Sequence, residues 1–276
     1  MAKKTSKKAS ASSRTTRQKL GRLAVRLALV ALALGLVAAW MWQRTLPLKT
    51  VAVVGNVQAQ AEDVIRLVRA TPDSVALFAL DPALMADRAE RHPWVREAHI
   101  RRLPTGTLRI RVEERQPAAL VLGADGRPAH FLDARGYAMP MRRGALADVP
   151  VLRGAVPEYH PTQPVDSRSL RELLAALASA DAETDALISE IVWSPTKTTL
   201  WTTPTSSRAT LPVRLGRTGQ ADQLRRLHAF WHQTVLPRPD VPIEAVDLRF
   251  EGQVVTKEAD LPVSTVLASA VSTASP

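Results

Sequence analysis

The sequence predicts an α+β protein with one N-terminal transmembrane helix, a small unit in the order β-α-α-β-β, and a larger mixed β unit with two helices. Three patterns support this prediction. A run of 16 residues near the N-terminus is apolar apart from one glycine. Segments in which apolar and polar residues alternate follow it, as expected of half-buried strands. Between them lie stretches whose apolar residues recur at helical spacing.

The chain has 276 residues, a net charge of +11 and no cysteine. The lack of cysteine excludes disulfides, thiolate catalysis and cysteine-ligated metal or haem sites. Nine of the 37 Lys and Arg residues fall within residues 1–26, which hold no acidic residue. The other 250 residues carry 28 basic and 26 acidic residues. The positive charge therefore belongs to a tail and not to the folded part of the protein.

The basic tail, residues 1–22, has too few apolar residues to bury, so we expect it to be disordered. It is either a nucleic-acid-binding arm or a topology signal, and the apolar run that follows favours the signal. We therefore expect no nucleic acid among the partners. An excess of Lys and Arg before an apolar run predicts a cytoplasmic N-terminus and an extracytoplasmic remainder.

The apolar run, Leu27–Trp42, reaches roughly 30 Å when it is extended back to Leu23, which matches the hydrocarbon core of a bilayer. We expect a transmembrane helix over residues 23–42. A cleaved signal peptide or a buried core helix is the alternative. The bulky residues that end the run, from Trp40 to Arg44, disfavour a cleavage site because signal peptidase needs small residues.

The first unit, residues 43–116, shows two short helices between strands. Asp81 followed by Pro82 is a typical helix start, because Asp caps the helix and Pro fits its first turn. Trp94 is expected in the core, where it can hold the second helix on the sheet. The predicted elements are strands at Leu48–Val54, Trp94–Arg102 and Thr107–Glu113, and helices at Glu62–Arg69 and from Asp81 to before Pro93.

Four motifs in this unit occur together in a known order. They are Val-Val-Gly-Asn (53–56), His-Pro-Trp-Val (92–95), Ala-His-Ile-Arg-Arg-Leu-Pro (98–104) and Leu-Arg-Ile-Arg-Val-Glu-Glu-Arg-Gln-Pro-Ala-Ala (108–119). The combination resembles a POTRA domain, in the version found in the FtsQ/DivIB family of bacterial cell-division proteins.

The second unit, residues 117–258, is predicted to be rich in strands. Leu170, Leu173, Leu174 and Leu177 mark one amphipathic helix, and a second stripe runs from Leu224 to Val235. We expect Val149–Leu152 to be a short edge strand and residues 181–185 to be an acidic loop. Residues 259–276 are expected to be a disordered tail. The other predicted strands are Ala118–Leu122, His130–Leu132, Ile188–Trp193, Thr198–Trp201, Ala209–Leu215, Ala245–Phe250 and Gln253–Lys257.

This second unit is also similar to the family pattern. The matching stretches are Phe-Leu-Asp-x-x-Gly (131–136), Leu-Gly-Arg (215–217) and Val-Asp-Leu-Arg-Phe (246–250). The family commonly has Tyr where Phe250 stands, so the ring is kept and its hydroxyl is lost.

No catalytic constellation is evident in the sequence. It has no Gly-x-Ser-x-Gly, P-loop or Gly-x-Gly-x-x-Gly motif. His228 and His232 are spaced to chelate a metal from one helix face, but no third ligand is evident. We therefore predict no metal, no cofactor and no enzymatic activity.

The resemblance implies a scaffold of the division machinery. It implies a single-pass inner-membrane protein at the septum that links early and late division proteins. It further implies binding to FtsB and FtsL through the second unit, and to other division proteins through the POTRA domain and membrane segment. Two alternatives are a POTRA-bearing component of outer-membrane protein export and a membrane-tethered cell-wall enzyme. Too little chain follows the POTRA-like unit for the barrel that export components carry.

The resemblance also implies a partner-binding surface near the C-terminus. In the family, this region accepts an added strand from FtsB, in which backbone hydrogen bonds supply affinity. Val246–Phe250 is expected to be the last well-patterned strand, with an open edge. The residues carried over are Arg217, Arg249, Phe250 and Gly252. The alternative is that both arginines are solvated surface charges and Phe250 is a core residue.

Overall fold

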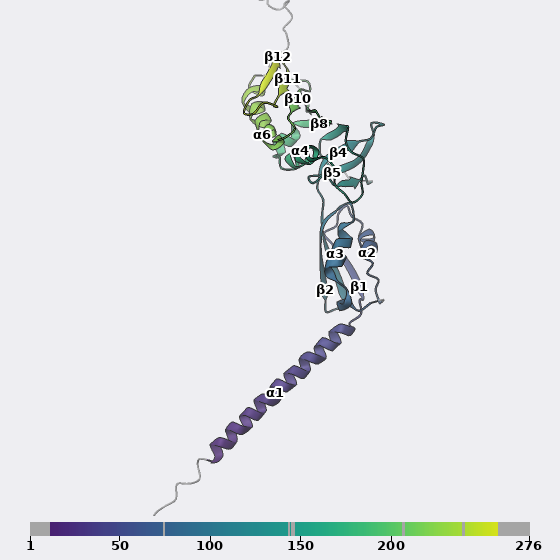
Figure 1. The fold of residues 1–276 in the computed structure, drawn as a ribbon, viewed down its shortest axis with the longest axis vertical. Coiled ribbons are helices and arrows are strands. Elements are labelled where there is room, and N and C mark those ends of the chain that lie inside the picture. Colours follow the sequence, from purple (N-terminus) through teal and green to yellow (C-terminus); the bar gives the residue numbers. More distant parts are fainter. Residues whose placement is uncertain are drawn as a thin grey trace, which may run out of the picture.

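The computed structural model describes residues 12–73, 75–142, 144, 147–205, 208–238 and 241–258. The chain leads from a long N-terminal helix, through a small unit, to a larger unit whose last strands lie farthest from that helix (Figure 1). Residues 1–11 and 259–276, both expected to be disordered, lie outside the described residues.

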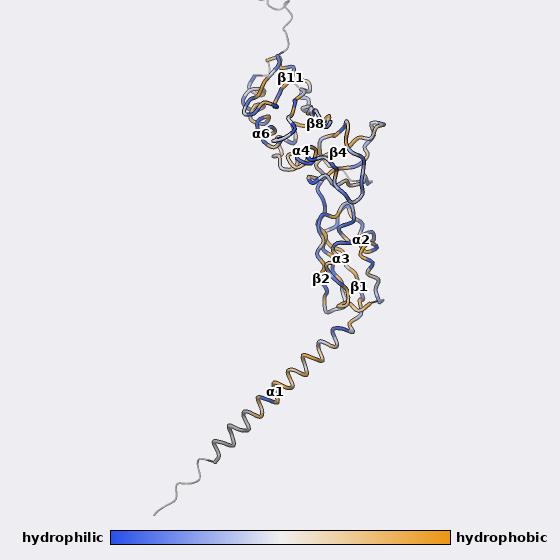
Figure 2. The backbone as a smooth tube through the Cα atoms, viewed as in Figure 1, coloured by the Kyte–Doolittle hydropathy of each residue, from blue (hydrophilic) through white to orange (hydrophobic). Residues whose placement is uncertain are grey.

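Helix α1 (Ser12–Thr45) stands apart from the two units (Figure 1). Its segment Leu23–Thr45 is, within the described part of the chain, the one helix long and apolar enough to cross a membrane (Figure 2). None of that segment is buried in the protein. The helix begins at Ser12, so residues 12–22 are helical rather than disordered. The Lys, Arg and Gln residues there are good helix formers and extend the apolar helix.

The small unit has the predicted order β-α-α-β-β, with a short 3₁₀ turn added. Strand β1 pairs in parallel with β3, and β2 pairs with β3 in antiparallel fashion. Asp81 caps α3 as predicted, because its carboxylate accepts a hydrogen bond of 2.9 Å from the Ala83 N–H. The elements are β1 (Thr50–Val54), α2 (Ala61–Val68), η1 (Leu77–Ala79), α3 (Pro82–Glu90), β2 (Val95–Leu103) and β3 (Thr107–Glu114).

The larger unit is built on a nine-stranded mixed sheet in the order β12-β11-β10-β9-β8-β7-β4-β5-β6. Helix α4 packs against β4 and β5, and α6 contacts both α4 and α5. The strands are β4 (Pro117–Leu122), β5 (Pro128–Asp133), β6 (Ala138–Pro140), β7 (Val151–Gly154), β8 (Ile188–Trp193), β9 (Thr198–Thr202), β10 (Pro212–Leu215), β11 (Ile243–Asp247) and β12 (Val255–Glu258). The helices are α4 (Arg168–Ala178), α5 (Ala182–Ala186), α6 (Gln220–Phe230) and the π-helical turn η2 (Trp231–Val235).

The predictions for residues 149–152 and for residues 181–185 are wrong. Strand β7 is not an edge strand, because it lies between β4 and β8 and is parallel to both. Parallel neighbours are joined by long crossovers, so the pattern of the strand itself does not reveal its position. The expected acidic loop forms the short helix α5, which Asp181 caps by accepting a 2.7 Å hydrogen bond from the Thr184 N–H.

Trp94 is buried as predicted, and it belongs to a core that both units share. Its ring meets Phe131 of β5 edge-on, with 6.1 Å between ring centroids. The indole N–H of Trp94 donates to the Pro140 carbonyl at 3.3 Å. Arg115 and Asp133 add a buried ion pair of 2.8 Å between the units. Only two residues separate β3 from β4, so the connection between the units is short. The aromatic contact, the hydrogen bond and the ion pair described above pack the space around it.

Candidate partner-binding surface

The four predicted partner-binding residues lie on two loops that are hydrogen-bonded to side chains of helix α6. Arg217 lies on the loop over residues 216–219, directly before α6. The other three residues lie on the loop over residues 248–254, between β11 and β12. Gln223 and Arg226, one turn apart on α6, each hold one of these loops.

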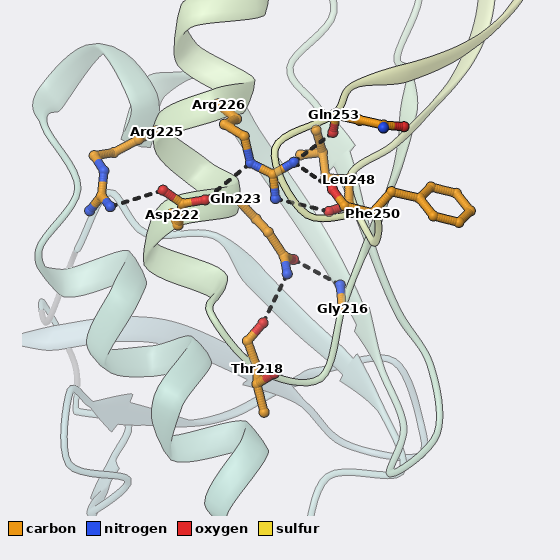
Figure 3. A network of polar contacts seen from close by, with 9 residues as sticks. All are labelled: Gly216, Thr218, Asp222, Gln223, Arg225, Arg226, Leu248, Phe250 and Gln253. Carbon is orange, nitrogen blue, oxygen red and sulfur yellow. Dashed lines mark hydrogen bonds and ion pairs between the residues drawn. The ribbon is translucent and has the colours of Figure 1, made fainter.

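Gln223 shapes the first loop. Its side-chain oxygen accepts a hydrogen bond of 2.8 Å from the Gly216 N–H, and its side-chain nitrogen donates to the Thr218 carbonyl at 2.9 Å (Figure 3). A Cβ atom at Gly216 would lie 2.7 Å from that nitrogen, so a larger residue there would displace the Gln223 amide. Arg217 is exposed, and among the described residues no salt bridge involves its guanidinium. The loop thus presents an arginine on a fixed backbone.

Arg226 shapes the second loop. Its guanidinium donates to the carbonyls of Leu248, Phe250 and Gln253, at 3.2, 2.8 and 2.5 Å (Figure 3). Its Nε also donates to Asp222 at 3.1 Å, one helical turn earlier. Hydrogen bonds to a charged donor are among the stronger ones in proteins. One half-buried side chain therefore holds three carbonyls of a loop that is far away in the sequence.

These contacts correct the predicted strand. Strand β11 ends at Asp247, so Arg249 and Phe250 lie on the following loop and not on the strand. The Leu248 N–H still donates to the Arg214 carbonyl of β10 at 2.9 Å, whereas the carbonyls of Leu248 and Phe250 accept hydrogen bonds from Arg226. Gly252 lies at the turn as predicted, with φ of +66°, a conformation that favours glycine.

Arg249 is hydrogen-bonded to the last residue of β11. Its guanidinium donates to both carboxylate oxygens of Asp247, with Nε to Oδ1 at 2.9 Å and Nη2 to Oδ2 at 2.6 Å. The side-chain hydrogen bond from Arg249 is the main reason that the pKa of Asp247 lies below its usual value. The Arg249 guanidinium carbon lies 6.0 Å from the centre of the Phe250 ring.

Phe250 is not a core residue. It is 51% exposed, and its ring points away from α6 (Figure 3). A large apolar side chain held outward on an ordered loop is a typical anchor for a protein partner. The structure thus excludes the alternative in which Phe250 packs into the core.

The outermost strand at this end of the sheet is β12. It pairs with β11 in antiparallel fashion, and all four of its residues are exposed. Within the described residues, the open edge therefore belongs to β12 and not to Val246–Phe250. Lys257 reaches back across the pair to Glu244 at 2.6 Å, so β12 carries a charged side chain, as edge strands often do.

Sequence reasoning missed Gln223 and Arg226. The spacing of Asp222 and Arg226 predicts only a helix-surface ion pair of the common i, i+4 type. Nothing local to α6 reveals that the same guanidinium reaches a loop more than 20 residues later. The only signal is indirect: a Gly-Arg-Thr-Gly loop needs a partner for its backbone groups.

A third group joins the two histidines of α6 and η2. Glu183 of α5 lies 3.1 Å from His228 and 3.2 Å from His232, in each case between its Oε2 atom and the ring Nε2. The sequence showed no third potential ligand, because α5 meets α6 only in the folded chain.

Comparison with known proteins agrees with this architecture. Residues 46–115 match the family described as "POTRA domain, FtsQ-type", and residues 123–249 match "Cell division protein FtsQ/DivIB, C-terminal". The "Cell division protein FtsQ" of Rhodothermus marinus is 47% identical over 221 residues, which cover 80% of this chain and 81% of that protein. The protein of the same name from Salinibacter ruber is 43% identical over 252 residues, covering 87% and 96%.

The two family matches follow one another along the chain and together span more than half of it. The relatives align over both units and extend over most of their own length. The chain therefore belongs to the FtsQ/DivIB family of cell-division proteins.

Proposed function

We propose that this protein is a non-enzymatic scaffold of the division machinery, fixed in the inner membrane by α1 and concentrated at the septum. In this proposal its N-terminal tail is cytoplasmic and the two units, residues 43–116 and 117–258, are extracytoplasmic. The second unit binds FtsB and FtsL. The first unit and the membrane segment contact other division proteins, so that early and late components are linked. Family membership and the single apolar helix support this proposal.

The observation that carries the partner proposal is the open edge of β12 beside the loop that Arg226 holds. An added strand can pair with an exposed edge through backbone hydrogen bonds, while neighbouring side chains supply specificity. Phe250 then serves as the apolar anchor, next to the edge and half exposed.

The two arginines have different roles in this proposal. The guanidinium of Arg249 is already hydrogen-bonded to both oxygens of Asp247, so its main role is to stiffen the loop that presents Phe250. Arg217 has an exposed guanidinium and is the better candidate for pairing with a carboxylate of the partner. Gly252 allows the turn that leads into β12.

The test is capture of FtsB and FtsL from membranes by the tagged full-length chain. Phe250→Ala and Arg217→Glu should each reduce capture, and the two changes together should abolish it. The matched controls are Leu236→Ala, which alters a side chain that is 53% exposed, and Arg127→Glu, which alters an arginine on the β4–β5 hairpin. Normal capture by the folded double variant, or equal loss in the controls, would contradict the proposal.

Orientation and location have their own test. A reporter that is active only outside the cytoplasm should work when fused at the C-terminus and fail when fused at residue 10. A fluorescent fusion should gather at the septum, and depletion should give filaments with unsplit septa. A defect confined to outer-membrane proteins or to cell-wall chemistry would instead favour the export or enzyme alternatives.

A further inference from the structure

We propose that Glu183, His228 and His232 form a binding site for a divalent transition-metal ion of the zinc type. The three side chains come from three elements: Glu183 from α5, His228 from α6 and His232 from η2. Their potential ligand atoms all lie within 4.8 Å of one another. None of the three residues belongs to the partner-binding loops over residues 216–219 and 248–254, and the proposal does not depend on the function proposed above.

Buried neighbours fix the backbone positions from which the side chains of the cluster extend. Thr184, next to Glu183, is 2% exposed, so α5 is fixed on the protein by a buried residue. Asp181 caps the same short helix. Trp231, between the two histidines, is 3% exposed and fixes the rotation of the helix. The site is thus anchored by buried neighbours, although its own side chains reach solvent.

The histidines lie on one face of the helix as it changes from α to π geometry. They are spaced i, i+4, and their ring centroids are 4.4 Å apart. The Leu236 N–H donates to the Trp231 carbonyl at 2.9 Å, the i to i+5 bond that marks a π turn. Such single π turns occur frequently at functional sites.

Two of the three ligand separations are close to those of a tetrahedral site, and the third is within 4.8 Å. Zinc lies about 2.0–2.1 Å from nitrogen and oxygen ligands, so two ligands of a tetrahedral site are roughly 3.3 Å apart. The Oε2 atom of Glu183 lies 3.1 Å from Nε2 of His228 and 3.2 Å from Nε2 of His232. Small rotations of exposed side chains can open these separations to the required value.

The ligand types select the metal. Two imidazoles and one carboxylate suit zinc and its neighbours, whereas calcium and magnesium need all-oxygen sites. Three protein ligands leave a fourth position for water or for a group from another molecule. Side-chain exposures of 70% for Glu183, 30% for His228 and 42% for His232 leave the site open to ions from solvent. A bound ion would fasten α5 to the end of α6.

The competing explanation is an ordinary surface ion pair, in which Glu183 interacts with a protonated histidine and no metal binds. Such exposed pairs contribute little to stability. The two explanations differ in one measurable property, which is stoichiometric binding of metal by all three side chains together.

The test uses the full-length chain in detergent, carrying a tag without histidine and stripped of metal by a chelator. Zn²⁺ binding is measured by calorimetry, and Co²⁺ is added as a spectroscopic probe of tetrahedral coordination. We expect one equivalent of Zn²⁺ to bind. Glu183→Gln and His232→Ala should each weaken binding by about tenfold or more, because loss of even an outer partner of a metal ligand costs about 10–100-fold.

The matched control is His99→Ala. His99 is also exposed and lies 3.4 Å from the carboxylate of Glu97. Among the described residues, however, this pair is not part of a group of three potential metal ligands. Its loss should leave the affinity for Zn²⁺ and the Co²⁺ spectrum unchanged. No stoichiometric binding by the unmodified chain, or equal binding by the chain and by both cluster variants, would overturn the proposal. Circular dichroism of each variant checks that it is folded.

Discussion

Trp94 joins the cores of the two units, so we expect its truncation to destabilise the protein strongly. Removing a large buried aromatic side chain costs about 3–5 kcal/mol, which we expect for Trp94→Ala. Trp94→Phe keeps a buried ring but loses the hydrogen bond to the Pro140 carbonyl, and should cost at least about 0.5–1.5 kcal/mol. Urea denaturation of the full-length chain, followed by circular dichroism, measures both.

A double-mutant cycle tests whether Trp94 acts across the joint. Phe131→Ala removes the ring on the other unit, whose centroid is 6.1 Å away. An edge-to-face aromatic pair contributes about 0.5–1.5 kcal/mol beyond its buried area, so the double variant should cost less than the sum of the single variants by that amount.

Trp193 supplies the matched control for this cycle. It is 2% exposed and lies in the core of the larger unit alone. Trp94→Ala and Trp193→Ala should therefore be additive to within about 0.3–0.5 kcal/mol. If the pair of Trp94 and Phe131 is just as additive, the two rings do not couple the units and the reasoning is refuted.

Three further predictions concern the loops around α6. Arg226→Met should speed amide hydrogen exchange in residues 248–254 and lower partner capture, because each lost hydrogen bond from a charged group costs about 1.5–3 kcal/mol; unchanged exchange would contradict the role of Arg226. Gly216→Ala should lower the melting temperature, because its Cβ would displace the buried Gln223. The pKa of Asp247 is lowered in the fold, so its stabilising effect is present above its ordinary value of 3.8 and fades as pH falls through the folded pKa. Denaturation at several pH values should show the stability gap between the unmodified chain and Asp247→Asn closing on acidification.

Elements with a strong local pattern could be predicted from the sequence. Strand β3 has apolar residues at every second position, and the structure buries Leu108, Ile110 and Val112. Helix α4 has its leucines at helical spacing, and the four predicted positions are buried. In both cases the period of the sequence matches the period of the backbone, so burial of one face follows directly.

Other features depend on neighbours that are distant in sequence. The alternating pattern continues to Phe250, but β11 ends at Asp247 and the following loop is hydrogen-bonded to Arg226 of α6. The central place of β7 depends on crossovers. The cluster of Glu183 with the two histidines needs α5, a helix of five residues that has too few positions to show a period. These features arise from tertiary structure.

The short connection between β3 and β4 also affects how far β12 lies from helix α1. The small unit lies between α1 and the larger unit, and β12 lies at the far end of the chain from α1 (Figure 1). Because the connection is short and buried contacts cross it, the larger unit is held at a set distance from the end of α1. If the proposed partner is anchored in the same membrane as α1, it can pair with β12 only when its stalk has a matching length. The effective concentration of its binding segment is highest at that length and falls when the stalk is shorter or longer.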